Sequence, residues 1–416
     1  MMDKRLPEVI LSFEPPAAPA GPVRLSVYPS ERDYFDYARE PRAEGVWLSR
    51  LFQEALLHDE AGWRRRTWQA SDAVEIGQRM WSSLPAKVRA TILDPAGETT
   101  RRVAVLRGGT GMDDVPWEWL NAGPETTIAA MDRIRFVRLV PTLRAVPPLT
   151  VVPPVRVLVA ITDAVGGPLF QPRIEIGVVA AGLERPVYDL RVVEESRLDA
   201  LLEALAWSPH IVHYVGHGGI SGSTGNLLLH DSHDGTRWVP AMEFARLLPA
   251  SVRLVCLSTC VSTENYEIGG LVRVAHCPPE FPLPTTIVNQ YAVTDLAASA
   301  FWSEFYPRLA SLEGCVLDAF HYARMSARAA SPDTACWAGF SLVLRDGAER
   351  PLRFGTAGAD QDERFAAELE AQWAARNANN LAIRMRTLQA GVQKHWEQTL
   401  AEEVARVESF ERDSGD

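Results

Sequence analysis

Two side chains that together could carry out nucleophilic catalysis, His217 and Cys260, each follow a short apolar run. HIVHYV at 210–215 precedes the first, and RLVCLS at 253–258 precedes the second. Apolar and β-branched runs of this length favour buried strands, and parallel strands bring their carboxyl ends to one edge of a sheet. We expect each strand to end at its reactive residue. A thiol and an imidazole at one edge would form a nucleophile and its base.

The chemistry that this pair implies is acyl transfer. A cysteine thiol with an unperturbed pKa of about 8.5 is mostly protonated at neutral pH. His217 would take that proton or hold its imidazolium against the thiolate, so that attack on a peptide carbonyl yields an acyl-enzyme. Gly218 lacks a Cβ, which lets a substrate carbonyl approach its backbone N–H. Together with the backbone N–H of Cys260, it would stabilise the oxyanion.

The elements that would position this pair alternate regularly along the chain. Strand-like runs at 155–161, 187–193, 210–215, 253–258 and 285–291 are separated by helical stretches near 172–184, 196–206, 241–248 and 267–276. This alternation predicts right-handed crossovers and a mostly parallel sheet with helices on both faces, an α/β fold. A last strand near 337–345 is expected to close one edge of the sheet.

A proline-rich segment divides the sequence. Residues 140–154 contain five prolines, which argues against a helix interior or a central strand and favours a hinge. Before it lie strand-like runs at 23–28, 101–107 and 133–140 and helical stretches near 47–58 and 72–83. The predicted organisation is a partly disordered leader at 1–22, a non-catalytic α/β unit at 23–150, a catalytic unit at 151–355 and a helical extension at 356–416.

The C-terminal extension has a helical pattern. Residues 360–411 are almost free of glycine and proline, and their apolar residues recur at spacings typical of one or two amphipathic helices. An apolar stripe of this kind packs on its own domain or receives another protein, and the pattern leaves both open. The stripe consists of Leu369, Trp373, Leu381, Met385, Leu388, Val392, Trp396 and Leu400.

Several segments resemble those of the CHAT-type cysteine peptidases, which belong to the clan of caspases, separases, gingipains and clostripain. Besides the segments around His217 and Cys260, DDVPWEWLNAG at 113–123 is similar to the family's Leu-Pro-Trp-Glu-Leu-Leu segment. GGLVRVAHC at 269–277, TTIVNQYAVTD at 285–295 and AASAFWSEFYPRLA at 297–310 resemble the helix, strand and closing helix after the family's cysteine. The resemblance covers roughly residues 25–350. It implies a caspase-like α/β/α sandwich, an endopeptidase with the His217–Cys260 dyad, and no cofactor.

The resemblance also suggests where a substrate side chain would bind. In this clan the residue two positions before the cysteine lines the first specificity pocket, and members that cut after Arg or Lys place an Asp there. Here that residue is Ser258. Asp163 corresponds to another pocket wall, and Asp295 is a further pocket candidate whose alternative role is a helix N-cap. Because the first specificity pocket would then contain one acid instead of two, we expect the enzyme to prefer an uncharged side chain, or a mixture of side chains, before the cut.

The biological setting is implied by the resemblance alone. Proteases of this family are latent until a sensor or an upstream protease engages them, often in bacterial antiviral defence or programmed death. For this chain, the resemblance implies a CRISPR-linked or another defence trigger. The expected partners are therefore a protein substrate and an activating protein. A pseudoprotease that serves as a protein-binding scaffold, with the dyad never aligned, is the alternative.

Composition argues against two further classes of protein, those that bind nucleic acid and those that span a membrane. The net charge of −11 argues against a nucleic-acid groove, which needs a concentrated basic face. No apolar run reaches the length of about 18 residues that a membrane helix needs. The five cysteines show no disulfide-scaffold spacing, which fits a reducing compartment, and we expect a cytoplasmic protein.

A zinc-stabilised adaptor is a third hypothesis, because His213, His217, Cys256 and Cys260 form a set of two histidines and two cysteines. Zinc sites favour ligands two to four residues apart on turns rather than inside buried strands, so the spacing argues against a metal. His213 is better interpreted as a packing and hydrogen-bonding residue, and Cys256 as part of the core.

Three other segments suggest sites only superficially. The glycine-rich segment 107–114 lacks the Gly-Lys-Ser/Thr ending of a phosphate loop. HDSHDG at 230–235 resembles a metal cluster, but its Asp-Gly pair predicts a hairpin turn. The three arginines at 64–66 fit a solvated helix face.

Overall fold

The computed structural model divides the chain into two compact units, Met1–Gly358 and Ala359–Asp416. It describes residues 8–14, 23–28, 46–48, 68–93, 100–106, 115–123, 126–140, 148–162, 177–180, 182–183, 187–194, 196–221, 224–230, 235–261, 285–291, 293–345 and 349–355. All of these belong to the first unit. The helical extension predicted at 356–416 and the helix predicted near 267–276 lie outside the described residues.

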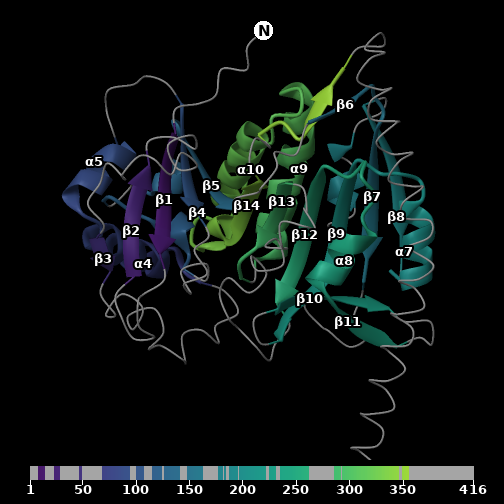
Figure 1. The fold of residues 1–416 in the computed structure, drawn as a ribbon, viewed down its shortest axis with the longest axis horizontal. Coiled ribbons are helices and arrows are strands. Elements are labelled where there is room, and N and C mark those ends of the chain that lie inside the picture. Colours follow the sequence, from purple (N-terminus) through teal and green to yellow (C-terminus); the bar gives the residue numbers. More distant parts are fainter. Residues whose placement is uncertain are drawn as a thin grey trace, which may run out of the picture. The chain divides into compact units, whose positions relative to one another are not determined.

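A 13-stranded sheet forms the frame of the first unit (Figure 1). Its main path runs in the order β11-β10-β9-β12-β13-β14-β5-β4-β1-β2-β3, with β7 beside β9 and β8 beside β7. The strands are β1 (Glu8–Glu14), β2 (Val23–Tyr28), β3 (Val46–Leu48), β4 (Arg101–Leu106), β5 (Ile134–Val140), β7 (Val155–Ile161), β8 (Tyr188–Val193), β9 (Ile211–Ser221), β10 (Thr224–His230), β11 (Thr236–Pro240), β12 (Leu254–Val261), β13 (Thr285–Asn289) and β14 (Phe340–Arg345).

Most strand pairs in the middle of this sheet are parallel. The pairs β7–β8, β7–β9, β9–β12, β12–β13, β14–β5, β5–β4 and β4–β1 are parallel, whereas β13–β14 and the hairpin pairs at the two ends of the path are antiparallel. Every residue of β5 and β13 is buried. Strands that are buried on both faces are typical of parallel sheets covered by helices on both sides, so the predicted α/β class is confirmed.

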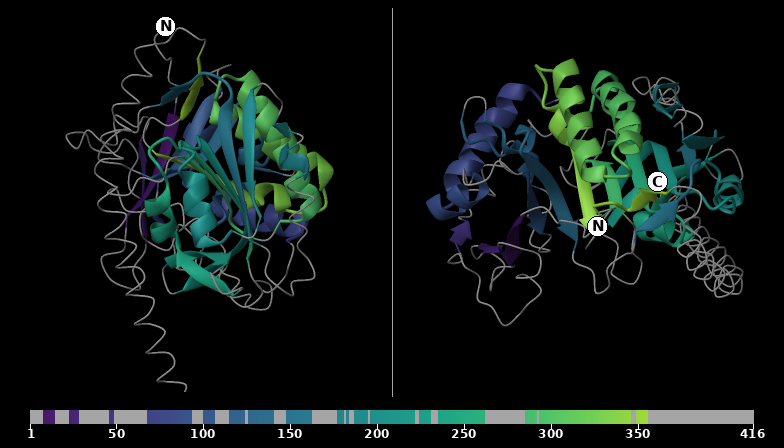
Figure 2. Two further views of the ribbon diagram at one scale, coloured as in Figure 1. Left: turned by 90° about the vertical axis from the view of Figure 1, so that its right-hand side faces the viewer. Right: turned by 90° about the horizontal axis from the view of Figure 1, so that it is seen from above.

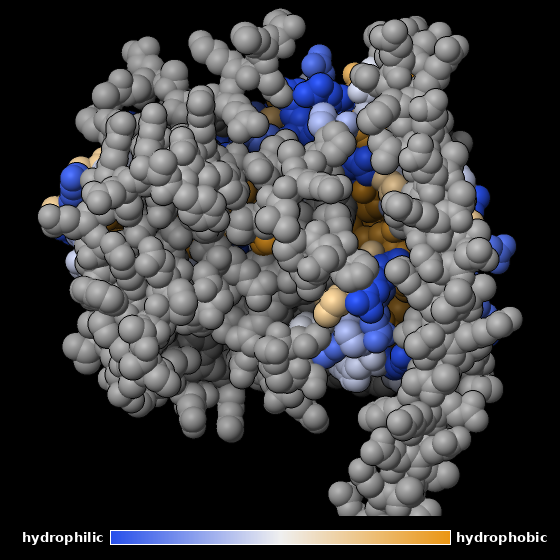
Figure 3. All heavy atoms as spheres, viewed as in Figure 1, coloured by the Kyte–Doolittle hydropathy of each residue, from blue (hydrophilic) through white to orange (hydrophobic). Residues whose placement is uncertain are grey.

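Helices cover both faces of the sheet. On one face, α4 (Ala70–Ser83), α5 (Ala86–Leu93), α9 (Asp295–Ser311) and α10 (Val316–Ala330) contribute to one buried cluster, and Figure 2 shows α9 and α10 side by side. On the other face, α7 (Leu198–Leu205) and α8 (Ala241–Leu247) contribute to a second cluster. Figure 3 shows hydrophobic residues among the grey atoms near the place where Figure 1 labels β9 and β7. Among the described helices, none is both long and apolar enough to cross a bilayer.

Alternate residues of each central strand belong to different clusters. In β7, Val157 and Val159 pack in the cluster under α9 and α10, and Leu158 packs in the cluster under α7 and α8. In β9, Val215 belongs to the first cluster and Tyr214 to the second. This alternation fixes which face each residue of β9 and β12 occupies.

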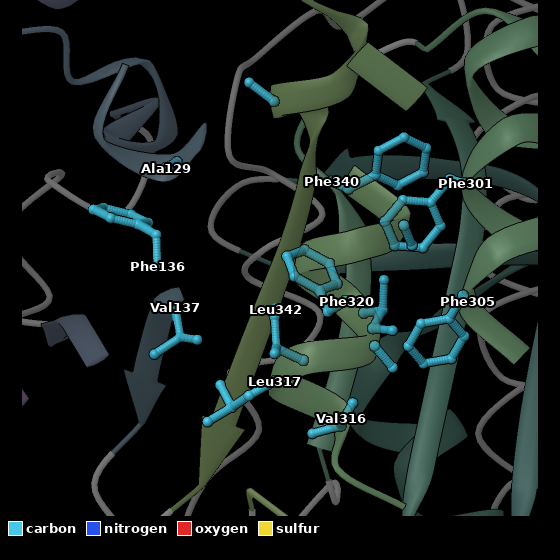
Figure 4. Close-up of a cluster of buried hydrophobic side chains, with 14 of the residues drawn as sticks. Ala129, Phe136, Val137, Phe301, Phe305, Val316, Leu317, Phe320, Phe340 and Leu342 are labelled. Carbon is cyan, nitrogen blue, oxygen red and sulfur yellow. The ribbon is translucent and has the colours of Figure 1, made fainter. Parts of the chain in front are cut away.

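Aromatic side chains fix α9 and α10 to β14. Phe301 of α9 stacks on Phe340 of β14, with ring centroids 4.0 Å apart and planes 11° apart. Phe320 of α10 meets Phe301 edge to face at 5.5 Å. Figure 4 shows these rings together with Leu342 and Leu317 beside β14. The contacts among these three rings therefore help to fix the position of the two helices on the sheet.

The last strand does not close an edge of the sheet as predicted. β14 lies inside the sheet, antiparallel to β13 and parallel to β5. Strands from before and after the proline-rich segment thus hydrogen-bond within one sheet, while the domain boundary at residue 150 stays a prediction. Within the proline-rich segment, β6 (Leu149–Val151) pairs with β15 (Leu352–Phe354) in a separate two-stranded sheet.

Two N-terminal segments contain strands that were not predicted, while the leader boundary at residue 22 stays a prediction. Residues 8–14, assigned to the leader, form β1, because Val9, Ile10 and Leu11 are buried and β1 pairs with both β4 and β2. A helix was expected near 47–58, but residues 46–48 form β3, and the rest of that stretch lies outside the described residues. The helices expected near 72–83, 196–206 and 241–248 are present as α4, α7 and α8.

We predict that Phe301→Ala lowers the free energy of unfolding by about 3–5 kcal/mol, because it removes a fully buried ring and leaves a cavity. The matched control on the same helix is Leu296→Ala, which truncates a side chain that is 59% exposed. It should change stability by no more than about 0.5 kcal/mol. Urea denaturation followed by circular dichroism measures both. Equal effects of the two substitutions would contradict this account of the core.

Candidate active site

The register of β9 and β12 brings together the two residues singled out in the sequence. The strands are parallel neighbours, and His217 pairs with Cys260. Adjacent strands lie about 4.8 Å apart. Residues distant in sequence therefore occupy neighbouring backbone positions. His217 is partly exposed, whereas the side chain of Cys260 is not among those the structure describes.

This pair lies beyond the last paired residues of the two flanking strands. The pairing of β7 with β9 ends at Ile161 and Val215, and the pairing of β12 with β13 ends at Leu257 and Val288. Open α/β sheets bind ligands in the crevice beyond the carboxyl ends of their strands. The position of the pair fits such a site.

The strands do not end at the reactive residues as predicted. β9 continues to Ser221 and β12 continues to Val261. The physical reason is the hairpin that follows β9: β10 pairs antiparallel with residues 218–221 and so provides hydrogen-bonding partners for the extended backbone. Gly218, the predicted oxyanion residue, consequently lies within β9, between Leu227 of β10 and Val261 of β12. Its oxyanion role stays a prediction.

Tyr214 holds the backbone at His217. Its hydroxyl lies within hydrogen-bond distance of the carbonyl oxygens of Leu228 and His217. Burial raises the pKa of Tyr214 well above its ordinary value, so the hydroxyl stays protonated and donates. The phenol crosses Gly216, where a Cβ would lie 2.5 Å from the tyrosine oxygen. Only glycine at 216 permits this close approach.

Asn289 performs a similar task on the cysteine strand. Its amide nitrogen donates to the carbonyl oxygen of Thr259 at 3.3 Å, and both residues are fully buried. Thr259 immediately precedes Cys260. The end of β13 therefore anchors the backbone that carries the thiol. Sequence reasoning missed Asn289, because an amide at the end of an apolar run has no distinctive spacing.

Four residues before the pair on each strand, His213 and Cys256 form a buried polar cluster with α9. His213 has its Nδ1 2.7 Å from the hydroxyl oxygen of Tyr306, and its ring centroid lies 4.4 Å from that of Trp302. The same hydroxyl lies 3.9 Å from Sγ of Cys256. The expected packing and hydrogen-bonding role of His213 and the core position of Cys256 are confirmed.

No three His, Cys, Asp or Glu residues gather as metal ligands within the described part of the chain. The proposed zinc set includes Cys260, whose side chain lies outside that part, so the set stays untested. The glycine-rich segment 107–114 and the arginines at 64–66 also lie outside the described residues. Residues 231–234 of the turn predicted at 230–235 lie outside the described residues, and the strands on either side, β10 and β11, are antiparallel.

The three pocket candidates have different surroundings. Ser258 is buried in β12 and pairs with Val215. Asp163 lies outside the described residues. Asp295 is exposed in the first turn of α9, but the N-cap is Thr294, whose hydroxyl accepts a hydrogen bond from the backbone N–H of Ala297 at 3.3 Å. The N-cap role suggested for Asp295 is therefore wrong, although a carboxylate in the first turn still favours the helix dipole.

A buried ion pair anchors the Pro-Trp-Glu-Trp segment to the sheet. Glu118, in the short 3₁₀-helix η2 (Trp117–Trp119), accepts hydrogen bonds from Arg138 of β5 at 3.0 and 2.8 Å and from Ser341 of β14 at 2.6 Å. Arg138 also donates to Gln290 at 2.6 Å. Burial raises the pKa of Glu118, but attraction to Arg138 and Arg324 and the hydrogen bonds outweigh it, so the pKa lies below its ordinary value.

A comparison of the sequence with known protein families gives one match. The family model for the CHAT domain matches residues 74–346, more than half of the sequence. The chain belongs to the CHAT domain family. No curated protein matches it.

The solved structures that resemble this chain include a gingipain and a separase complex. The Arg-specific gingipain R (RgpB) of Porphyromonas gingivalis is 10% identical, with a TM-score of 0.40, over 68% of this chain and 71% of that chain. The Saccharomyces cerevisiae separase–securin complex is 16% identical, with a TM-score of 0.36, over 66% of this chain and 18% of that chain.

We predict that Glu118→Gln lowers the free energy of unfolding by about 3–5 kcal/mol at neutral pH, because it leaves the buried charge of Arg138 without its partner. The control is Glu75→Gln, which removes an ion pair with Arg79 whose side chains are 66% and 64% exposed. It should cost no more than about 0.5 kcal/mol. Urea denaturation measures both.

The pH dependence of this difference provides a second test. The folded-state pKa of Glu118 lies below its ordinary value of 4.5, so its ionisation contributes stability that is present above pH 4.5 and lost as the pH falls through the folded-state pKa. The gap between wild type and Glu118→Gln should therefore narrow in acid. A gap that stays constant down to acid unfolding would contradict the role given to this carboxylate.

Proposed function

We propose that this chain is a cysteine endopeptidase in which Cys260 is the nucleophile and His217 is its base. The observation that carries the proposal is the parallel register that pairs these two residues beyond the ends of the flanking strands. Membership of the CHAT domain family supports it independently. A sheet edge with a thiol next to an imidazole supplies the two groups that acyl transfer from a peptide requires.

In the proposed reaction, the thiol proton of Cys260 passes to His217 and the sulfur bonds to the carbonyl carbon of the substrate. The oxyanion accepts hydrogen bonds from the backbone N–H groups of Gly218 and Cys260. The C–N bond then breaks, and the imidazolium of His217 gives its proton to the leaving amine. Water next attacks the thioester while His217 takes its proton, and the departing sulfur restores the resting pair.

The substrate is proposed to be a protein cut next to an uncharged or mixed set of side chains. Ser258, not an acid, occupies the position two residues before the nucleophile. Asp163 and Asp295 remain candidates for the same pocket. Resemblance to the family supports a latent, cytoplasmic enzyme that a sensor or upstream protease switches on, within bacterial antiviral defence or programmed death.

We predict that Cys260→Ala abolishes cleavage of unfolded protein substrates while leaving the fold intact. The matched control is Cys256→Ala, on the same strand: Cys256 is fully buried, and its Sγ lies 3.9 Å from the hydroxyl oxygen of Tyr306. It should lower stability modestly and retain activity. Release of peptides, measured by mass spectrometry, compares the variants. Retained cleavage by the Cys260 variant would remove the central claim, and inactivity of the wild type with its activator present would favour the scaffold alternative.

Substitution of His217 and of His213 should likewise have different effects, one on the rate of cleavage and the other on stability. His217→Ala is expected to reduce the rate by about 10²–10⁴-fold through loss of the base. His213→Ala should act through stability, because its ring is buried between Tyr306 and Trp302. Turnover per folded molecule, after correction by thermal denaturation, is the measurement. If His213 proved essential for turnover and His217 dispensable, the assignment of the base would be wrong.

A further inference from the structure

Trp238 of β11 is an exposed indole next to the candidate site. Its side chain is 43% exposed, although tryptophan is highly buried on average. The ring lies across Gly219 of β9, where a Cβ would come within 3.0 and 3.1 Å of two ring atoms. Glycine at 219 therefore lets the six-membered ring of the indole approach the strand that carries His217, while the side chain as a whole stays 43% exposed.

The strand register places this indole on the same face of the sheet as His217. Side chains two residues apart on a strand share a face, which groups Gly219 with His217. Across the hairpin, Gly219 pairs with Asn226, and Leu228 pairs with Trp238. Directly opposed residues of neighbouring strands share a face. The flanking residues Leu227, Leu229 and Val239 pack in the cluster on the opposite face, as this grouping requires.

The order of strands also fixes the direction from one group to the next. From β12 through β9 and β10 to β11, the sheet presents Cys260, then His217, then Trp238. Neighbouring strands are about 4.8 Å apart, so Trp238 starts about two strand spacings from His217, and its ring reaches back towards Gly219. The indole therefore lies on the side of β9 that is remote from β12, the strand of Cys260.

The direction from Cys260 to His217 is the direction in which the leaving part of the substrate is expected to extend. In acyl transfer the sulfur bonds to the carbonyl carbon, and the imidazolium protonates the amine that leaves. The residues after the scissile bond belong to that amine, so they extend past His217 and away from Cys260. An extended peptide advances about 3.3 Å per residue. The first or second residue after the scissile bond can thus reach the indole.

We propose that Trp238 is a specificity-determining residue that binds a large apolar side chain one or two positions after the scissile bond. The proposal rests on the endopeptidase function proposed above. Such a side chain would remove the remaining apolar surface of the indole from water, the driving force for its binding. Among aromatic and aliphatic side chains, rings would also gain from edge or offset contacts with the indole.

The test is cleavage of a peptide library prepared from a whole proteome, with both sides of each cut identified by mass spectrometry. Wild type should enrich Phe, Tyr, Leu or Met in the two positions after the cut. Trp238→Ala should lose this enrichment and lower kcat/KM about 10-fold for peptides that carry it, while the preference before the cut stays unchanged. Trp238→Phe should retain it. The control is Tyr322→Ala on α10, a comparably exposed ring at 41%, which should behave as wild type.

The possible outcomes separate the two proposals. Cleavage without apolar enrichment after the cut, or enrichment that survives Trp238→Ala, would overturn the role of Trp238 and leave the endopeptidase standing. Enrichment of Arg or Lys there would assign the indole to cation binding instead and would equally overturn the proposal. Absence of cleavage by wild type with its activator would contradict the endopeptidase function itself, and the role of Trp238 with it. The unchanged preference before the cut shows that the Trp238 variant is folded.

Discussion

The centre of this sheet depends on the buried ion pair and hydrogen bonds of the Glu118 carboxylate. It joins η2 to β5 through Arg138 and to β14 through Ser341, and Arg138 in turn holds Gln290 at the end of β13. Two charges out of water are stable only when each has its partner and its hydrogen bonds. These contacts therefore require three strands and η2 to assemble together.

Residues at the end of β13 connect these contacts to the candidate site. Gln290, fixed by Arg138 and by a hydrogen bond from its side chain to the carbonyl oxygen of Ala338, directly follows Asn289. Asn289 in turn holds the carbonyl of Thr259, next to Cys260. On the neighbouring strand, Tyr214 holds the carbonyl of His217. Both members of the proposed dyad thus have their backbone positioned by a buried side chain from the scaffold, as a preorganised site requires.

Much of this arrangement was predictable from sequence. The run at 155–161 is β7, and the parallel class follows from apolar runs alternating with helical stretches. The position of β14 was not predictable, because an apolar strand has the same sequence pattern at an edge and in the middle of a sheet. Its place beside β5 becomes evident from contacts between distant residues, such as those of Arg138 and Ser341 with Glu118. The continuation of β9 past His217 also escaped prediction, since its partner strand β10 comes from a later hairpin. Trp238 lacked any signal until register aligned it with Gly219.

The central claim is that His217 and Cys260, paired in register, act as one thiolate–imidazolium unit. The most direct measurement is the rate at which iodoacetamide alkylates Cys260 as a function of pH, followed by peptide mass spectrometry, in wild type and in His217→Gln. The account predicts that wild-type Cys260 reacts well below pH 8.5 and that the substitution shifts its reactivity towards the unperturbed thiol pKa of about 8.5. Superimposable pH profiles for the two proteins would contradict it.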